Sequence, residues 1–561
     1  MKRFLSLLLA LALSAALTIP AFASGFTDIP VDSSLSGEVE KANQYGLMSG
    51  YSSTAFGYAD PVTRAQFVTI VGRMLGWFEG AHTDLSYITD AMQIKYPQDV
   101  SADYWTAISL AVKNDAVDST VPFRPSAAIT RAEMAEILVR ALGLKSAAAL
   151  TKRMWANRVT ALTFAGRFAD LPGDGDSASY ITVAAELGVT NGTSATTFSP
   201  SATATRAQAA AMLVRVYERL GQDVTWNHAF YAISSYSQLA AVKTLNLNAV
   251  SAGWSRMTWD GSTAKLATTS ANGNEYCIPS GYETVADVLA EQGRALNLSV
   301  YMDTSGGLSE LLASETGRAQ AAEQISNELT VSYSKLGRNP YSGVTIDFEG
   351  LRSAQKDNFT AFLKVLSSKV KSLNKSLFVC VSPFLTTGSY YNGYDYRAIG
   401  ELADKVILMA YDYDARDLSD HVGTEYYKTA APVPIDQVYA SLLIITREDT
   451  GVADAGKLVL GLNTKRTAWK IDQDGKLLSG TPVYPDSATV AKRLSQSDTE
   501  KGWSNAYQCS YAVYTAEDGN RYFLWYQSKA ARQTELNAAR LFGIHGVSIW
   551  RLGTIPEDWL A

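Results

Sequence analysis

The C-terminal half of the chain is organised around Gly343-Val-Thr-Ile-Asp-Phe-Glu-Gly350. Side chains alternate across a β-strand, so Thr345, Asp347 and Glu349 share one face and the apolar residues share the other. The apolar face predicts packing against helices, and the polar face then points into a barrel. Buried carboxylates are costly unless they are paired or used. We therefore expect an active site at the C-terminal mouth of a barrel, the alternative being a purely structural hydrogen-bonded pair.

The residues from 226 to 561 show short β-rich runs that alternate with longer amphipathic stretches, which is typical of βα units. The eight candidate strands are 229–236, 247–254, 298–303, 343–349, 377–383, 405–412, 458–463 and 546–552. Eight such units predict a (β/α)8 TIM barrel, an α/β fold. The seventh and eighth strands are separated by a long segment, about 464–527, with Asp-Gly turns at 474–475 and 518–519. This segment predicts a small α+β insertion.

The N-terminal half contains the motif Thr-Arg-Ala-Glx three times, at 63–66, 130–133 and 205–208. A threonine followed three residues later by Glu or Gln is the pattern of a capping box, and an apolar helical pattern follows each copy. An aromatic residue and an aspartate precede each copy in the same order. Internal repetition of this kind predicts three helical repeats, which we place at 24–78, 96–145 and 165–222.

The three copies resemble S-layer-homology (SLH) repeats. This resemblance implies an all-α pseudo-trimer whose grooves bind pyruvylated secondary cell-wall polysaccharide. It places Arg64, Arg131 and Arg206 at the anionic sugar, and a guanidinium suits that role because it pairs with a carboxylate through two hydrogen bonds. The alternative is that each arginine only closes an ion pair at the N-terminus of its helix.

The octapeptide resembles the end of the D-x-x-D-x-D-x-E signature of family 18 glycoside hydrolases. Asp347 and Glu349 fill the last two acidic positions, whereas Ser342 and Thr345 stand at the first two. Two further stretches agree: 409–412 resembles the Met-x-Tyr-Asp motif of that family, and 546–553 resembles the strand with its active-site tryptophan. The barrel as a whole resembles the branch of spore-cortex-lytic N-acetylglucosaminidases.

The family 18 resemblance implies a retaining mechanism in which the substrate's own 2-acetamido group is the nucleophile. In that scheme Glu349 is the acid and then the base, Asp347 orients the acetamido group, and Tyr411 hydrogen-bonds its oxygen. The expected substrate-binding residues are Asp412, Trp550 and Thr345. The alternative for Tyr411 and Trp550 is plain core packing. No metal and no organic cofactor is needed for this chemistry.

The N-terminus has the pattern of a signal peptide over residues 1–23: Lys2 and Arg3, an apolar run, and the small-x-small site Ala21-Phe-Ala23. A membrane anchor is the alternative, but the run falls short of the ~20 residues that a span needs. No later run is long and apolar enough to span a membrane. We therefore expect a secreted protein attached to the cell wall or S-layer of a bacterium.

The composition excludes several other classes. The net charge of −6 argues against a nucleic-acid partner. Cys277, Cys380 and Cys509 are odd in number and far apart, which excludes a disulfide framework. The histidines form no metal-ligand pair, so no metal site is expected.

The preferred hypothesis is a wall-anchored glycoside hydrolase that cleaves β-linked N-acetylglucosamine glycans, such as peptidoglycan or a related wall glycan. One alternative is a surface chitinase that acts on external polymer. Another is a lectin-like barrel that binds glycans without cleaving them, and the presence of Glu349 argues against it because lectin-like relatives commonly lose that acid.

Overall fold

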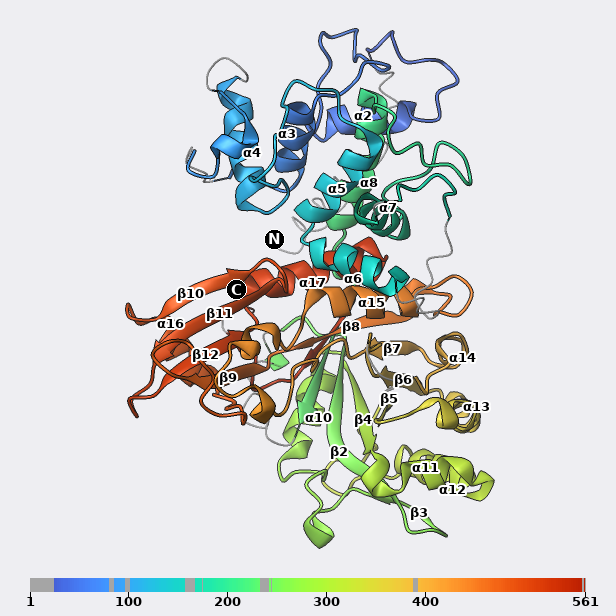
Figure 1. The fold of residues 1–561 in the computed structure, drawn as a ribbon. Coiled ribbons are helices and arrows are strands. Elements are labelled where there is room, and N and C mark those ends of the chain that lie inside the picture. The colour runs from blue at the N-terminus through green and yellow to red at the C-terminus, as the bar shows by residue number, and fades with distance from the viewer. Residues whose placement is uncertain are drawn as a thin grey trace, which may run out of the picture. The chain divides into compact units, whose positions relative to one another are not determined.

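The computed structural model describes residues 25–79, 85–95, 101–156, 167–173, 175–232, 242–243, 245–386, 392–556 and 559 (Figure 1). The expected signal peptide, the aromatic-x-Asp start of the second repeat at 96–99, and part of the first predicted strand lie outside these ranges. The chain divides into two compact units, Met1–Met134 with Ser199–Tyr217, and Ala135–Phe198 with Glu218–Ala561. Each unit is described by itself.

The first unit is helical. Its complete helices are α2 (Ser36–Gln44), α3 (Arg64–Met74) and α4 (Ala102–Lys113). It also contains the first turn of α5 (Arg131–Ala141) and most of α8 (Arg206–Leu220). The capping box that the motif predicts is present at α3, where Gln66 N donates to Thr63 Oγ1 at 3.2 Å and Thr63 N donates to Gln66 Oε1 at 3.0 Å. The same exchange occurs at the starts of α5 and α8.

The three motifs also contact one another through isolated antiparallel bridges that precede the helices. These bridges pair Pro61 with Thr205, Thr63 with Ala128, and Thr130 with Thr203. Each copy therefore bridges to both others, as expected for a threefold arrangement of repeats.

The second unit contains α6 (Lys145–Ala156) and α7 (Asp176–Glu186), followed by a closed barrel of parallel strands. Its strands, in spatial order, are β1 (Trp226–Ala232), β2 (Ala249–Trp259), β4 (Ala295–Met302), β5 (Gly343–Phe348), β6 (Ser376–Val381), β7 (Lys405–Leu408), β8 (Leu458–Asn463) and β13 (Gly546–Trp550). Pairing of β13 with β1 closes the ring. The prediction of eight parallel barrel strands is confirmed, although the bounds of single strands differ, and a short extra strand, β3 (Ala264–Ala267), pairs antiparallel with β2.

The sixth strand of the barrel differs from its prediction at one end. We expected the strand over 405–412 to continue through Tyr411 and Asp412, but β7 ends at Leu408. The backbone of Asp412 has φ of +61°, a left-handed conformation that no β-strand accommodates. The chain therefore turns where the Met-x-Tyr-Asp motif begins.

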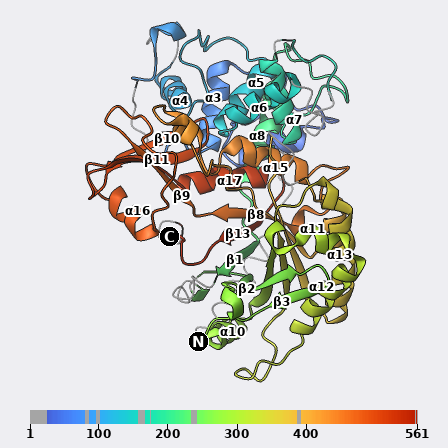
Figure 2. The same cartoon turned by 60° about the horizontal axis from the view of Figure 1, so that its bottom comes forward.

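Helices cover the outside of the barrel (Figures 1 and 2). They are α10 (Tyr282–Glu291), α11 (Leu308–Ala313), α12 (Glu315–Glu328), α13 (Lys356–Ser372), α14 (Tyr396–Leu402), α15 (Ile435–Ile445) and α17 (Lys529–Leu541). Phe348 of β5 packs outward on α13, where its ring centroid lies 5.3 Å from that of Phe362. This contact confirms that the apolar face of the octapeptide meets a helix and leaves its polar face to the interior.

The insertion between β8 and β13 is an α+β subdomain, as predicted. It contains β9 (Arg466–Ile471), α16 (Ser487–Leu494), β10 (Glu500–Ser504), β11 (Cys509–Thr515) and β12 (Arg521–Tyr526). The strands form an antiparallel sheet in the order β10-β11-β12-β9, in which Arg466 pairs with Tyr526. Gly475 and Gly519 in the two predicted turns have φ of +76° and +77°, which only glycine adopts without strain.

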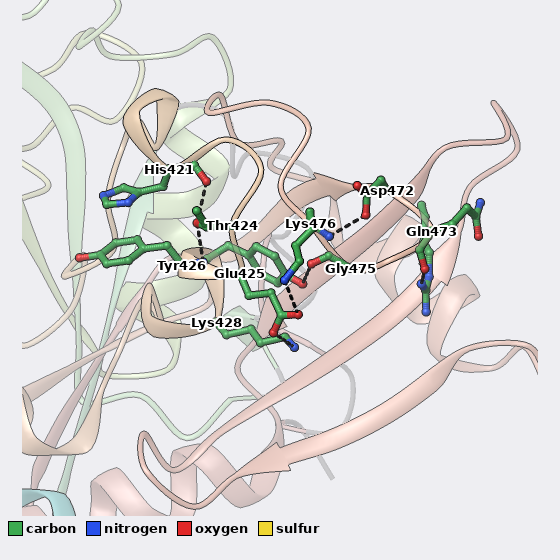
Figure 3. A network of polar contacts seen from close by, with 11 residues as sticks. His421, Thr424, Glu425, Tyr426, Lys428, Asp472, Gln473, Gly475 and Lys476 are labelled. Atoms are coloured by element: carbon green, nitrogen blue, oxygen red, sulfur yellow. Dashed lines mark hydrogen bonds and ion pairs between the residues drawn. The ribbon is translucent and has the colours of Figure 1, made fainter.

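The subdomain is fixed to the loop that follows β7 by polar contacts (Figure 3). Glu425 of that loop forms ion pairs with Lys428 at 2.6 Å and with Lys476 of the insertion at 3.2 Å. The Tyr427 hydroxyl donates a hydrogen bond to Gly475 O at 2.8 Å. The Tyr427 side chain also packs in a buried cluster with Trp469 and Trp525. The insertion is therefore held against the barrel by both apolar burial and charge.

Candidate active site

The polar face of β5 leads from the buried interior to a cavity at the carboxyl ends of the strands. Thr345 is fully buried, Asp347 is 7% exposed, and Glu349 lies just beyond the strand at the mouth. Asp347 and Glu349 line a cavity of about 180 Å³, together with Trp550 and Phe230. The fold thus brings together three of the predicted site residues that are far apart in the sequence.

The two carboxyl groups hold protons more tightly than ordinary carboxyls do. Burial raises the pKa of Glu349, and the charges of Asp412 and Asp303 raise it further, while Arg416 opposes the shift. Burial, and then the charge of Glu349, raise the pKa of Asp347 well above its usual range. A closely spaced buried pair of this kind retains a proton where isolated carboxyls have lost theirs.

Asp347 keeps one acceptor atom unused. Its Oδ1 is buried and has no hydrogen-bond partner among the described residues. A buried carboxylate oxygen without a donor is unfavourable by itself. Because Asp347 lines the cavity, an N–H or O–H group of a bound molecule can supply the missing donor.

Tyr411 and Asp412 lie at the carboxyl end of β7 and do not themselves line this cavity. The Tyr411 side chain is buried, and its pKa is raised by burial and then by neighbouring acids that include Asp347 and Glu349. The Asp412 side chain is about half exposed and accepts a hydrogen bond of 2.8 Å from Asn463 Nδ2. Lys465 Nζ lies 3.3 Å from the Asp412 carboxylate.

Thr345 is placed one layer deeper than the cavity. Its hydroxyl lies 2.6 Å from Ser251 Oγ, which lies 2.8 Å from Nε2 of His228, and Nδ1 of His228 lies 2.7 Å from Ser548 Oγ. Burial lowers the pKa of His228 to about 3, so the imidazole is neutral in this chain of hydrogen bonds. The structure therefore places the Thr345 hydroxyl in an interior network and not at the cavity where substrate contact was predicted.

The arginines of the three repeats have different surroundings in the first unit. Arg206 lines a cavity of about 180 Å³ with Gly50 and Arg73, and its guanidinium lies 4.5 Å from the ring centroid of Tyr51. Arg64 forms an ion pair of 2.7 Å with Glu133, which matches the alternative considered for it. Arg131 is buried and lines neither the cavity beside Asp347 and Glu349 nor the cavity beside Arg206.

Both halves of the chain match known protein families. Glycosyl hydrolases family 18 matches residues 227–554. The chain belongs to this family. The S-layer homology domain matches residues 25–68, 99–135 and 167–210.

Individual proteins are similar to parts of the chain. The cortical fragment-lytic enzyme of Bacillus subtilis is 23% identical over 244 residues, which are 42% of this chain and 52% of that protein. A cell surface protein of Thermoanaerobacter kivui is 30% identical over 148 residues, 25% of this chain and 19% of that protein. The structure of the Bacillus cereus spore cortex-lytic enzyme SleL has a TM-score of 0.47 at 18% identity and covers 60% of this chain and 72% of that one. The chain thus spans about half the length of the cortical fragment-lytic enzyme.

The family 18 domain also contains site residues that the sequence analysis did not identify. Tyr276 and Tyr301 line the cavity and stack on each other with centroids 4.7 Å apart and rings 7° from parallel. The Tyr301 hydroxyl donates to Asp303 Oδ2 at 3.0 Å. Asp303 is the last residue of the third predicted strand, but Tyr276 belongs to a loop, and no motif marked it. On the β7 side, Asp414 accepts from Lys465 at 2.7 Å although its side chain has no exposed surface.

No helix in the described ranges is long and apolar enough to cross a membrane. Within the same ranges, no group of three or more His, Cys, Asp or Glu residues is arranged to hold a metal ion.

Proposed function

We propose that the protein is a secreted, wall-attached glycoside hydrolase that cleaves β-linked N-acetylglucosamine glycans of peptidoglycan or a related wall polymer. The observation that supports this proposal best is the combination of Asp347 and Glu349 at one cavity, with a buried Asp347 Oδ1 that lacks a donor. An acetamido N–H is a donor of the required kind.

The proposed reaction needs only groups of the chain, the substrate and one water molecule. The sugar at the cleavage point lies against Trp550, and Asp347 accepts the acetamido N–H so that the carbonyl oxygen faces the anomeric carbon. Glu349 donates its retained proton to the leaving oxygen as the carbonyl attacks, and Tyr411 hydrogen-bonds the acetamido oxygen. Glu349 then removes a proton from the water that opens the oxazolinium ion, so the anomeric configuration is retained.

The test of the acid is Glu349→Gln in the full chain. The amide keeps the shape of the side chain but transfers no proton, so turnover should fall by ~10²–10⁴-fold or more while glycan binding stays near that of the wild type. Glu310→Gln, an exposed change on α11, is the matched control. Near-normal turnover of Glu349→Gln would show that another group is the acid.

The substrate is tested with N-acetylated and de-N-acetylated glycan, because only the former supplies the nucleophile. Equal cleavage of both by the wild type contradicts the substrate-assisted mechanism. Cleavage of chitin but not of peptidoglycan favours the surface chitinase. Binding of N-acetylated glycan without any cleavage favours the lectin-like barrel.

We also propose that the S-layer homology repeats attach the protein to secondary cell-wall polysaccharide, with Arg206 at the anionic sugar and Arg64 and Arg131 at equivalent positions. The cavity beside Arg206 supports this for the third arginine. Co-sedimentation of full-length Arg206→Gln with purified walls should be weaker than that of Arg215→Gln, which changes an arginine outside the cavity. Equal binding of the wild type to walls stripped of the polysaccharide would contradict attachment through it.

A further inference from the structure

A second cavity lies within the family 18 domain, between α16 of the insertion and the segment that follows β13. Its volume is about 630 Å³, which is within the range of small-molecule sites. Its polar lining includes Arg466 and Gln527, and its apolar lining includes Val490, Leu494 and Ile555. The proposed hydrolytic reaction uses none of these residues.

Arg466 is a buried cation that forms no ion pair with the described residues. It is 8% exposed, and within the described part of the chain it donates hydrogen bonds only to the hydroxyl of Ser487 and the carbonyl oxygen of Thr554. No carboxylate of the described residues lies within ion-pair distance of its guanidinium. The charge of Asp486 reaches Arg466, but that carboxylate accepts the Thr489 amide at 2.7 Å and caps α16. A buried charge is costly unless a counter-charge joins it, so the cavity favours an anion.

Gln527 supplies an independent indication of a ligand. Its side chain is 3% exposed, and its Oε1 has no hydrogen-bond partner within the described part of the chain. Its amide nitrogen contacts the sulfur of Cys509 at 3.7 Å, which leaves the oxygen as the unused acceptor of a side chain whose residue lines the cavity. An unsatisfied buried acceptor calls for an N–H or O–H donor.

The lining defines the chemistry of the ligand. Arg466 requires an anionic group, and planar carboxylates match a guanidinium best. Gln527 requires a nearby N–H, and the apolar side formed by Val490, Leu494 and Ile555 suits a small aliphatic group. An acylated amino acid or the end of a short peptide has a carboxylate, an amide N–H and an aliphatic side chain together.

We infer that this cavity binds the carboxylate end of a short peptide. The peptide would come from peptidoglycan, which has stem peptides attached to its glycan, whereas chitin has none. In this respect the inference rests on the proposed function. One backbone contact links the linings of the two cavities: the amide of Thr464, which lines this cavity, donates to the carbonyl oxygen of Trp550, which lines the active-site cavity, at 3.2 Å. Occupation of the cavity would then favour peptide-bearing glycan over plain chitin.

The test is calorimetric titration of the full chain with N-acetyl-D-alanine and with its uncharged amide. The acid should bind saturably, and the amide at least ~10-fold more weakly, because a charge-assisted pair is lost. Arg466→Met should reduce binding of the acid by a similar factor, whereas Arg493→Met, a change on α16 outside the cavity, should not.

Gln527→Leu keeps the test decisive if Arg466→Met fails to fold. It removes the unused acceptor and one weak contact of the amide nitrogen with Cys509 Sγ, so it should weaken binding without lowering the unfolding midpoint. Absence of saturable binding, equal binding of acid and amide, or full affinity in a folded Arg466→Met protein would each overturn the inference. The titration needs no turnover, so Glu349→Gln should bind the acid as the wild type does. Failure of hydrolysis and failure of this site are therefore separate results.

Discussion

Asp347 is a residue whose ionised form the fold disfavours, because burial and the charge of Glu349 raise its pKa. The pKa of Asp347 is higher in the folded protein than in the unfolded chain, so its ionisation destabilises the fold. The destabilisation is complete at pH values above the folded pKa and absent at pH values below the unfolded pKa. Asp347→Asn should therefore raise the thermal unfolding midpoint at neutral pH, and the gain should vanish as the pH falls through the ordinary carboxyl range. Asp420→Asn, at an exposed site, is the control. A lower midpoint for Asp347→Asn at neutral pH would contradict this explanation.

The shifted pKa of His228 makes the stability of the protein depend on pH in the opposite direction. Its pKa is lowered to about 3 from 6.5, so the unfolded chain takes up a proton there before the folded protein does. Stability is lost progressively as the pH falls from about 6.5 towards 3. We predict that His228→Gln, which still offers a donor and an acceptor to Ser251 and Ser548, has a flatter dependence of its free energy of unfolding on pH across that window. Denaturant titrations at several pH values measure it, and parallel curves for the two proteins would refute the assignment.

At the scale of elements, β8 approaches the end of β7 closely because residue 461 is glycine. A Cβ at Gly461 would lie 2.8 Å from Leu408 O and 2.9 Å from the Tyr411 ring. Gly461→Ala should therefore displace Tyr411 and reduce turnover, by ~10²-fold if the shift reaches about 1 Å. Gly37→Ala, where a Cβ meets nothing within 4 Å, is the control. Wild-type turnover in a folded Gly461→Ala protein would show that Tyr411 has no role in the reaction.

The sequence predicted those elements whose identity depends on local pattern. The alternation in the octapeptide of β5 placed Asp347 and Glu349 inside, and the Asp-Gly turns predicted the insertion. The early end of β7 was missed because the left-handed backbone of Asp412 leaves no mark in the residue pattern. The Tyr276–Tyr301 stack and the Arg466 cavity were missed for another reason: each forms between segments that are distant in sequence, where only the folded chain determines contact.

At the scale of the whole molecule, the proposed attachment and the proposed hydrolysis use separate sets of residues, which belong to different units of the chain. Sites with no shared partners contribute independently. Full-length Arg206→Gln should hydrolyse a soluble glycan at the wild-type rate while losing wall binding, and Glu349→Gln should show the reverse. Turnover assays and wall co-sedimentation on the same preparations test this. Loss of both functions in either variant would mean that the two halves are coupled.

The pairing of Arg466 with Tyr526 has a consequence for how such a protein can change during evolution. The two residues are register partners, so the insertion leaves and rejoins the barrel about 5 Å apart, the spacing of adjacent strands. A segment with neighbouring ends can be lengthened, shortened or exchanged without moving the strands that support it. The cavity that Arg466 and Gln527 line can therefore diversify by exchange of the insertion at this single junction, while the octapeptide with its carboxyl pair stays unchanged.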